Sequence, residues 1–181
     1  MFILFALVFM RMTGAIALNP ILGRSNIPNP VKGAMILVLS FLLYGGTDGV
    51  LTHEPAFMLE FGFMLIKELM VGFVIGFSME LSFAVVRFAA AVLDYIMGLS
   101  MAQTYDPQYN TQMTITSGMF YTFLVLLFLA GDGHVRLMAL IYHSARLIPF
   151  GEVMIRPELS TLMVEIFKTS IATGLQLAFP I

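Results

Sequence analysis

Among the charged side chains of a long apolar segment, five recur at a spacing of seven residues. The segment covers residues 54–98, and these charges are Glu60 and Lys67, followed by Glu80, Arg87 and Asp94. Seven residues make nearly two helical turns, so the members of each group share one helix face. Carboxylates and cations in this arrangement could relay ions through a membrane, or they could form ion pairs with neighbouring protein.

The energetics of the segment argue against lipid contact at the charged face. One charge at the bilayer centre costs about 2.5–3.5 kcal/mol, whereas one Leu, Ile or Phe returns only about 0.3–0.6 kcal/mol. Residues seven apart are separated by ~10 Å along the axis, which predicts that they do not pair with each other. We therefore expect their partners on other helices or other subunits. The alternative is a helix that stands outside the bilayer with these charges in water.

The composition is that of a membrane protein. Hydrophobic residues make up 59% of the chain and charged residues 11%, and the mean hydropathy is +0.93, whereas soluble domains carry about 25% charge. The net charge of −2 gives no footprint for nucleic acid. The chain has no cysteine, which excludes disulfides, thiolate nucleophiles and cysteine-ligated metal centres. No cofactor is expected, and no phosphate-binding loop is present.

Helices long enough to position these charges follow from the apolar runs and their breakers. We predict helices over residues 2–18, 31–44, 54–98, 113–130, 134–147 and 158–179, bounded by Asn19-Pro20, Gly45-Gly46, Gly131 to Gly133, and Pro149. Arg11 follows the first apolar run rather than preceding it, so we interpret that run as an uncleaved helix. The third segment would be ~68 Å long as one helix, against a hydrocarbon core of ~30 Å. It is therefore expected to turn near residues 78–82 or to extend outside lipid.

Two further features stand out along this helical pattern. Gly72 and Gly76 form a Gly-x-x-x-Gly motif, which allows another helix to approach closely. Residues 99–112 are mostly polar without periodicity, which predicts a loop. A loop between two apolar elements is tolerated at membrane depth only where it is buried in protein or lines a cavity.

Metal and catalytic sites are poorly supported. The three histidines are His53, His134 and His143, and the nine residues between the last two place them on opposite sides of a helix. Asp132 beside His134 suggests a hydrolase pair, but no serine lies in a nucleophile elbow. The intramembrane-enzyme hypothesis is therefore the weakest, and we expect no enzymatic activity.

An ordered set of residues along the whole chain resembles the FliR family of flagellar export-gate proteins, which also includes the T component of virulence injectisomes. No single element is specific, but the ordered set is. It comprises Arg11, Pro20, Ile27-Pro28, Val31-Lys32, Gly72, Gly76, Arg87, Met97 to Ala102, Asp106-Pro107, Leu127 to Leu129, Gly133-His134, Ser144, Pro149 and Gly151.

The resemblance implies an all-α, membrane-derived subunit made of helical hairpins, in a helical export gate that also contains FliP-like and FliQ-like membrane proteins. FlhA-like and FlhB-like export proteins would be further partners, and unfolded proteins the substrates. The location implied is the bacterial inner membrane, multi-pass, in the flagellar basal body. The resemblance also implies that a loop plugs the closed channel, here Gly98, Leu99, Ser100, Met101, Ala102, Gln103, Thr104, Tyr105, Asp106 and Pro107.

The chain departs from the family pattern in places. Asp94 stands where the family commonly has glycine, and Met101 and Thr104 stand where it often has phenylalanine. Residues 1–181 resemble one FliR-like domain that lacks a C-terminal hairpin of the family. The alternatives are an injectisome gate subunit, or a secondary transporter that uses Glu80, Arg87 and Asp94 as an ion relay.

Overall fold

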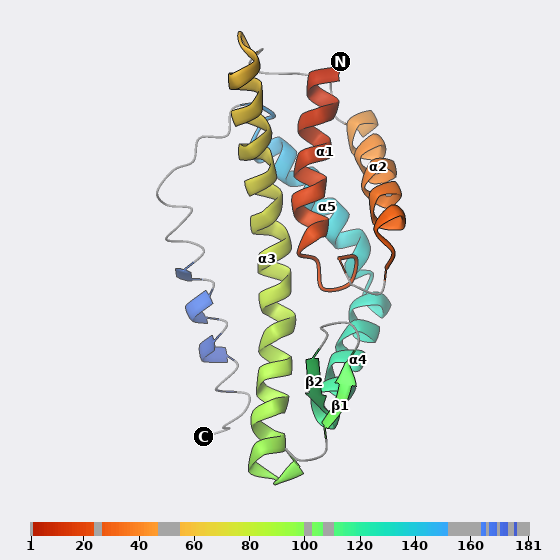
Figure 1. The fold of residues 1–181 in the computed structure, drawn as a ribbon, viewed down its shortest axis with the longest axis vertical. Helices are drawn as coiled ribbons and strands as arrows, with labels where there is room; N and C mark the ends of the chain where they lie inside the picture. The colour runs from red at the N-terminus through yellow and green to blue at the C-terminus, as the bar shows by residue number, and fades with distance from the viewer. Residues whose placement is uncertain are drawn as a thin grey trace.

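The computed structural model describes residues 2–23, 27–46, 55–99, 103–106 and 111–151, and within the C-terminal part residues 164–165, 167–169, 171–173 and 176. Its elements are mainly helices in an elongated bundle (Figure 1). In chain order they are α1 (Phe2–Ala17), α2 (Asn29–Gly46), α3 (Met58–Ile96), β1 (Gln103–Asp106), β2 (Thr111–Thr114), α4 (Ile115–Ala130) and α5 (Gly133–Leu147). The predicted all-α class is confirmed, and one small β-hairpin is added to it.

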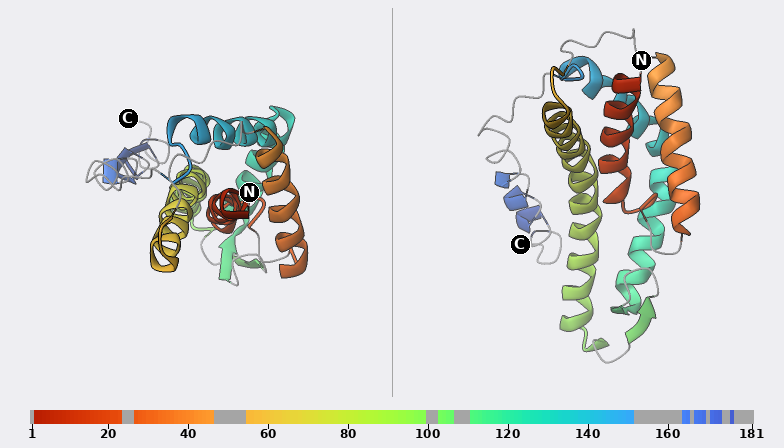
Figure 2. Two further views of the ribbon diagram at one scale, coloured as in Figure 1. Left: turned by 90° about the horizontal axis from the view of Figure 1, so that it is seen from above. Right: turned by 45° about the horizontal axis from the view of Figure 1, so that its top comes forward.

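Helix α1 is the centre of the bundle. Seen from above, it lies between α2, α3 and α5 (Figure 2). One side of α1 is almost fully buried, with Leu7 and Val8 at 0% exposure and Met12 and Ile16 at 1%. A helix that is apolar on all sides is stable only when neighbours surround it, and these contacts form the main hydrophobic core.

Helix α3 is a single continuous helix of 39 residues, about 58 Å long at 1.5 Å per residue. The turn that the sequence allowed near residues 78–82 is not present. The hydroxyl groups of Ser78 and Ser82 donate to the carbonyl groups of Val74 and Ser78, four residues earlier. These bonds keep both hydroxyls satisfied within the helix, so the serines do not break it.

The segment predicted as a loop contains an antiparallel β-hairpin, so the prediction of a structureless loop over residues 99–112 is wrong in part. Strands β1 and β2 pair in the register Gln103 with Thr114, Thr104 with Met113, and Tyr105 with Gln112. Each strand has only four, mostly polar residues, so the sequence shows no period of two there. Pairing with the opposite strand stabilises the extended backbone there.

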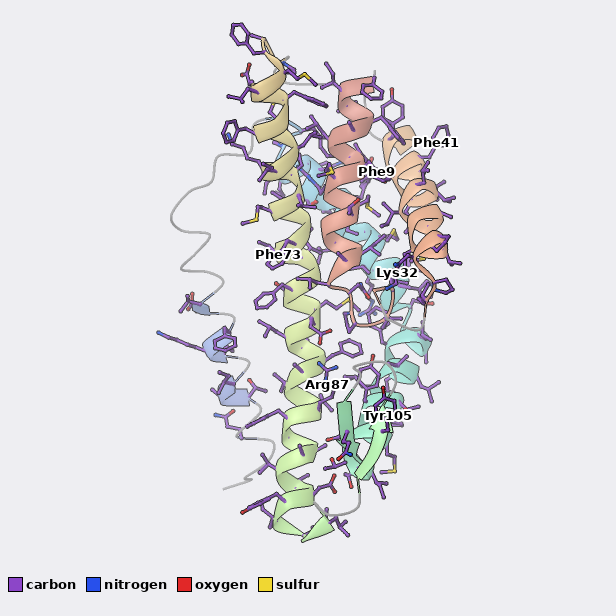
Figure 3. The ribbon with its side chains drawn as sticks, in the orientation of Figure 1. Phe9, Lys32, Phe41, Phe73, Arg87 and Tyr105 are labelled. Atoms are coloured by element: carbon purple, nitrogen blue, oxygen red, sulfur yellow. The ribbon has the colours of Figure 1, made fainter. Side chains whose placement is uncertain are left out.

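Within the described residues, the two helices α2 and α3 are long and apolar enough to cross a membrane, and the α4–α5 pair, bent by 68°, would make a third if counted as one span. Large apolar side chains remain exposed on these helices, including Phe41 (68%), Phe63 (59%) and Phe123 (58%). Figure 3 shows Phe41 and Phe73 among the side chains on the outside of the bundle. Apolar surface on this scale marks contact with lipid or with other proteins.

Candidate functional site

The end of α3 leads directly into the region where the gate loop is expected. Met97 caps the helix, and Gly98 follows with φ +73°, a left-handed conformation that favours glycine. Met97 and Leu99 are exposed, at 56% and 47%. Ser100, Met101, Ala102 and Pro107 lie outside the described residues. The candidate plug therefore starts with a reversal of chain direction at Gly98.

The β-hairpin carries the described part of the candidate plug. Tyr105 on β1 is 59% exposed and lies directly opposite Gln112 on β2, which is also exposed. The hairpin lies beside the second half of α3, and Tyr105 lies further towards the C-terminal end of α3 than Arg87 does (Figure 3). Strand β2 continues without a break into α4 at Ile115. The hairpin is therefore held at both ends by helices.

Asp94 on α3 faces the point where the hairpin becomes α4. Its side chain is 1% exposed, and neither carboxylate oxygen has a hydrogen bond to a described residue. The nearest polar groups belong to the first turn of α4, namely the hydroxyls of Thr114 and Thr116 and the N–H groups of Thr116 and Ser117. A helix N-terminus carries partial positive charge, so Asp94 offers this turn a favourable electrostatic contact.

Ser117 and Tyr121 on α4 extend the polar contact between the helices. The Ser117 hydroxyl donates to the Arg87 carbonyl (3.0 Å), and the Tyr121 hydroxyl donates to the Pro20 carbonyl (2.8 Å). The Arg87 guanidinium lies 5.6 Å from the centre of the Tyr121 ring. Together with Asp94, these groups fix the start of α4 against α3, and so they fix the base of the hairpin.

Arg87 also forms an ion pair with Glu80 on the same helix. The prediction that charges seven residues apart cannot pair is therefore wrong for these two. Their Cα atoms are separated by ~10 Å along the axis, but a long arginine and a glutamate reach towards each other over two turns. Both side chains are partly exposed, at 17% and 26%. Such a pair is worth at most about 1 kcal/mol.

The first two of the five charges lie in the first half of α3. Glu60 lies in the first turn of α3 and accepts a hydrogen bond from the Ala56 N–H (2.8 Å), which satisfies one of the free donors at that helix end. Lys67 is partly buried. The structure thus spreads the five charges over different environments and does not gather them into one line.

Gly72 and Gly76 lie on the face of α3 that contacts α1. A Cβ atom at Gly72 would lie 2.0 Å from the Arg11 carbonyl oxygen, and one at Gly76 would lie 2.8 Å from the Ala15 carbonyl oxygen. On α1, a Cβ at Gly14 would lie 2.3 Å from the Leu69 carbonyl oxygen. The two backbones are therefore in direct contact, which only glycine permits at these points.

The same face contains a buried ion pair that the sequence analysis did not identify. The Arg11 guanidinium on α1 binds the Glu68 carboxylate on α3 at 2.6 Å, and both side chains are 0% exposed. Arg11 also donates to the Ile148 carbonyl (3.0 Å) and lies 4.3 Å from the centre of the buried Phe150 ring. Glu68 accepts a further bond from the Gly151 N–H (3.2 Å). The pair thus joins α1, α3 and the turn that follows α5.

A signal for Glu68 was present in the sequence. Glu68, Gly72 and Gly76 are spaced by four residues and so lie on one helix face. The seven-residue pattern, in contrast, includes the adjacent Lys67 and not Glu68. Arg11, Ser144 and Gly151 all belong to the set of residues that carries the family resemblance. In the structure these three residues lie close together, and Arg11 also donates to the Ser144 hydroxyl (3.4 Å). Their widely separated positions in the chain gave no indication of this.

Catalytic or metal-binding groupings do not emerge from the described part of the chain. His134 and His143 are exposed on α5, and Asp132 is exposed at the α4–α5 bend with φ 55°. His53 lies outside the described residues. No group of three His, Cys, Asp or Glu side chains that could hold a metal occurs among the residues that were searched.

The helices, their glycine-mediated packing and their exposed apolar faces define a helical protein of the membrane type. The chain belongs to the FliR family of bacterial export proteins: the family model described as "Bacterial export proteins, family 1" matches residues 2–181. It is 25% identical over 172 residues to the Flagellar biosynthetic protein FliR of Escherichia coli K12, which covers 95% of this chain and 65% of that protein.

Two further relatives carry the same printed name. The protein of Pectobacterium carotovorum is 27% identical over 96% of this chain and 66% of its own length. The protein of Bacillus subtilis is 28% identical over 80% of this chain and 55% of its own length. The chain thus spans between 55% and 66% of the length of these three relatives.

Proposed function

We propose that this chain is a structural and gating subunit of the flagellar type III protein export gate, where it forms part of the channel for unfolded export substrates. Residues 1–181 would act as one FliR-like domain in a hetero-oligomer with FliP-like and FliQ-like membrane subunits, in the inner membrane at the flagellar basal body. FlhA-like and FlhB-like proteins would contact this assembly. A flagellar role is favoured over an injectisome role because the relatives are named as flagellar proteins.

The observation that carries this proposal is the β-hairpin between α3 and α4. It follows Gly98 at the end of the longest helix, exposes Tyr105, and is fixed at its base by Asp94 and Ser117. A short, polar segment of this kind can close a narrow channel formed by surrounding helices. A two-stranded hairpin is only marginally stable by itself, so little free energy is needed to open it.

A gate role explains why the chain exposes so much apolar surface. Partner helices would cover the exposed side chains of Phe41 on α2, Phe73 on α3 and Phe123 on α4. The five spaced charges would then lie in or near protein interfaces. Energy for transport would come from partners, and the chain itself would not be an enzyme.

The secondary-transporter alternative receives less support. An ion relay needs neighbouring groups that can exchange an ion along one path. Here Glu80 pairs with Arg87, whereas Asp94 faces the first turn of α4. Reconstituted ion or solute flux from this chain alone, without partner subunits, would favour the transporter.

The test of gating is deletion of residues 103–108 in the assembled gate. We expect higher leakage of small solutes across the membrane, measured as swelling or dye release in cells that express the whole assembly. Deletion of the equally long residues 164–169, of which the described ones are exposed, serves as the control. Normal permeability in an assembled gate without residues 103–108 would contradict the plug.

A further inference from the structure

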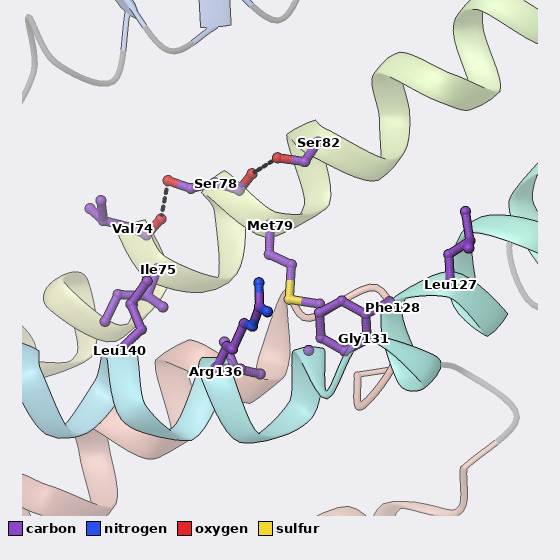
Figure 4. Close-up of a pocket in the computed structure, with 12 residues that line it drawn as sticks. Val74, Ile75, Ser78, Met79, Ser82, Leu127, Phe128, Gly131, Arg136 and Leu140 are labelled. Carbon is purple, nitrogen blue, oxygen red and sulfur yellow. Dashed lines mark hydrogen bonds between the residues drawn. The ribbon is translucent and has the colours of Figure 1, made fainter.

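A recess lies between α3 and the α4–α5 bend, and the proposed gating does not use it. It has a volume of about 600 Å³ and is lined by Val74, Ile75, Ser78, Met79, Ser82, Leu127, Phe128, Gly131, Gly133, Arg136, Leu137 and Leu140. Figure 4 shows the helices around it and the side chains that face it. Its volume lies within the range of ligand sites, which is about 300–1,000 Å³.

The shape of the recess follows from the bend between α4 and α5. Asp132 has a left-handed backbone conformation between the two helices, and the chain bends there by 68°. The Phe128 ring lies against Gly133, where a Cβ atom would be only 2.3 Å from the ring. Phe128 and Gly133 therefore form a fixed inner wall, and α3 closes the opposite side.

Arg136 is the charged residue of an otherwise apolar lining. Its side chain extends from α5 towards α3, close to Met79 in the close-up (Figure 4). Within the described residues, no carboxylate forms an ion pair with it. The hydroxyls of Ser78 and Ser82 donate to their own helix, so the guanidinium is the group that can offer several donors to a ligand.

The recess opens towards the apolar outside of the bundle. Leu127 and Leu140 at its edge are 53% and 52% exposed. A ligand that fits must therefore have one anionic group for Arg136 and an apolar part that continues onto the surface. A helix of another subunit would pack along a continuous apolar stripe on one helix. Here three helices, α3, α4 and α5, surround a recess instead.

We propose that this recess binds an acidic phospholipid of the surrounding bilayer. The guanidinium of Arg136 donates to the phosphodiester, and an acyl chain lies along Val74, Ile75 and Leu140. Basic pockets between apolar helices are known recognition sites for acidic head groups, and guanidinium–phosphate bonds are charge-assisted. This binding does not depend on the gating function.

The test compares spin-labelled phosphatidylglycerol with spin-labelled phosphatidylcholine on the purified assembly in nanodiscs. Both lipids carry a phosphodiester, but the choline ammonium of phosphatidylcholine neutralises it. We therefore expect a preference of about threefold to tenfold for the acidic lipid, whose net negative charge remains available to Arg136. Arg136→Gln should abolish this preference. Arg146→Gln removes the same charge from the same helix, where Arg146 stacks on Tyr142 at 4.9 Å, and should leave it unchanged.

A second pair of variants tests the apolar part of the recess. Leu140→Trp fills it and should release the bound acidic lipid, whereas Leu147→Trp, at a position that is 82% exposed and outside the lining, should not. Equal losses in Arg136→Gln and Arg146→Gln would overturn the proposal. So would a photocrosslink from position 140 to a partner polypeptide, because that result would identify a different occupant.

Discussion

Arg11 and Glu68 form an ion pair between α1 and α3, with 2.6 Å between the charged groups and no exposure of either side chain. The pair lies one helical turn from the point where Gly72 touches the α1 backbone. Burial of two charges costs several kcal/mol, which the pair and its additional hydrogen bonds must offset. Here Ile148, Phe150 and Gly151 supply those additional contacts. The pair therefore specifies how α1, α3 and the end of α5 fit together.

Removal of one partner from this pair should strongly destabilise the chain. For Glu68→Gln we expect a loss of about 3–5 kcal/mol, because Arg11 then stays buried without a counter-charge. The measurement is the thermal unfolding midpoint of the detergent-solubilised assembly. The double variant Arg11→Met with Glu68→Met should regain most of the loss.

The partly exposed pair on α3 is the matched control. Glu80→Gln removes a carboxylate from Arg87, but solvent screens that pair, so the expected loss is below about 1 kcal/mol. Equal losses for Glu68→Gln and Glu80→Gln would show that the burial of Arg11 and Glu68 has no special energetic weight.

The contact between α1 and α3 should not tolerate a methyl group at Gly72. Gly72→Ala places a Cβ 2.0 Å from the Arg11 carbonyl, so the helices must separate, at a cost of about 1–3 kcal/mol or more. Gly62→Ala is the control on the same helix, where nothing lies within 4 Å of the added Cβ. That control should be neutral or stabilise the helix by up to about 1 kcal/mol. The measurement is the thermal unfolding midpoint of each variant. Similar midpoints for Gly72→Ala and Gly62→Ala would contradict a direct backbone contact at Gly72.

The helices could be predicted from sequence because their signals are local. The apolar run that ends at Asn19-Pro20 gave α1, and the run that ends at Gly45-Gly46 gave α2, each within two residues of the observed bounds. What the sequence could not provide was the pairing of distant residues. Arg11 and Glu68 are 57 residues apart. The spacing of Glu68 with Gly72 and Gly76 indicates a shared helix face, but it does not indicate the partner on α1.

The site shows the same division between local and distant information. Gly98 and the polar residues after it were recognisable as the end of a helix, but β1 and β2 are only four residues each. Their conformation depends on each other and on α3 and α4. The Glu80–Arg87 pair was not predicted for another reason. The prediction considered only the distance between the Cα positions, whereas the length of the two side chains decides whether they can pair.

Asp94 should contribute through its charge and its position together. Asp94→Asn keeps the size but removes the negative charge that faces the first turn of α4, so we expect a loss of about 1–2 kcal/mol. Hydrogen exchange at the N–H groups of Thr116 and Ser117 should become faster, because this turn then opens more often. Ser82→Ala, at an exposed position of α3, should leave that exchange unchanged. Unaltered exchange in Asp94→Asn would mean that the carboxylate does not stabilise the turn.

Opening of the gate should require the two strands of the hairpin to separate. Strand β2 continues directly into α4, whose first turn is held against α3 by Asp94 and Ser117, so the hairpin cannot easily move as a rigid unit. Tyr105 and Gln112 are direct partners across the strands, and Cβ atoms of such partners lie about 4.5–5.5 Å apart, close enough for a disulfide after a small adjustment.

The chain has no other cysteine, so Tyr105→Cys with Gln112→Cys gives one defined cross-link. We expect the oxidised variant to lose export of flagellar substrates and a reductant to restore it, whereas each single variant should export normally under both conditions. Full export through a completely cross-linked hairpin would rule out strand separation as the opening step.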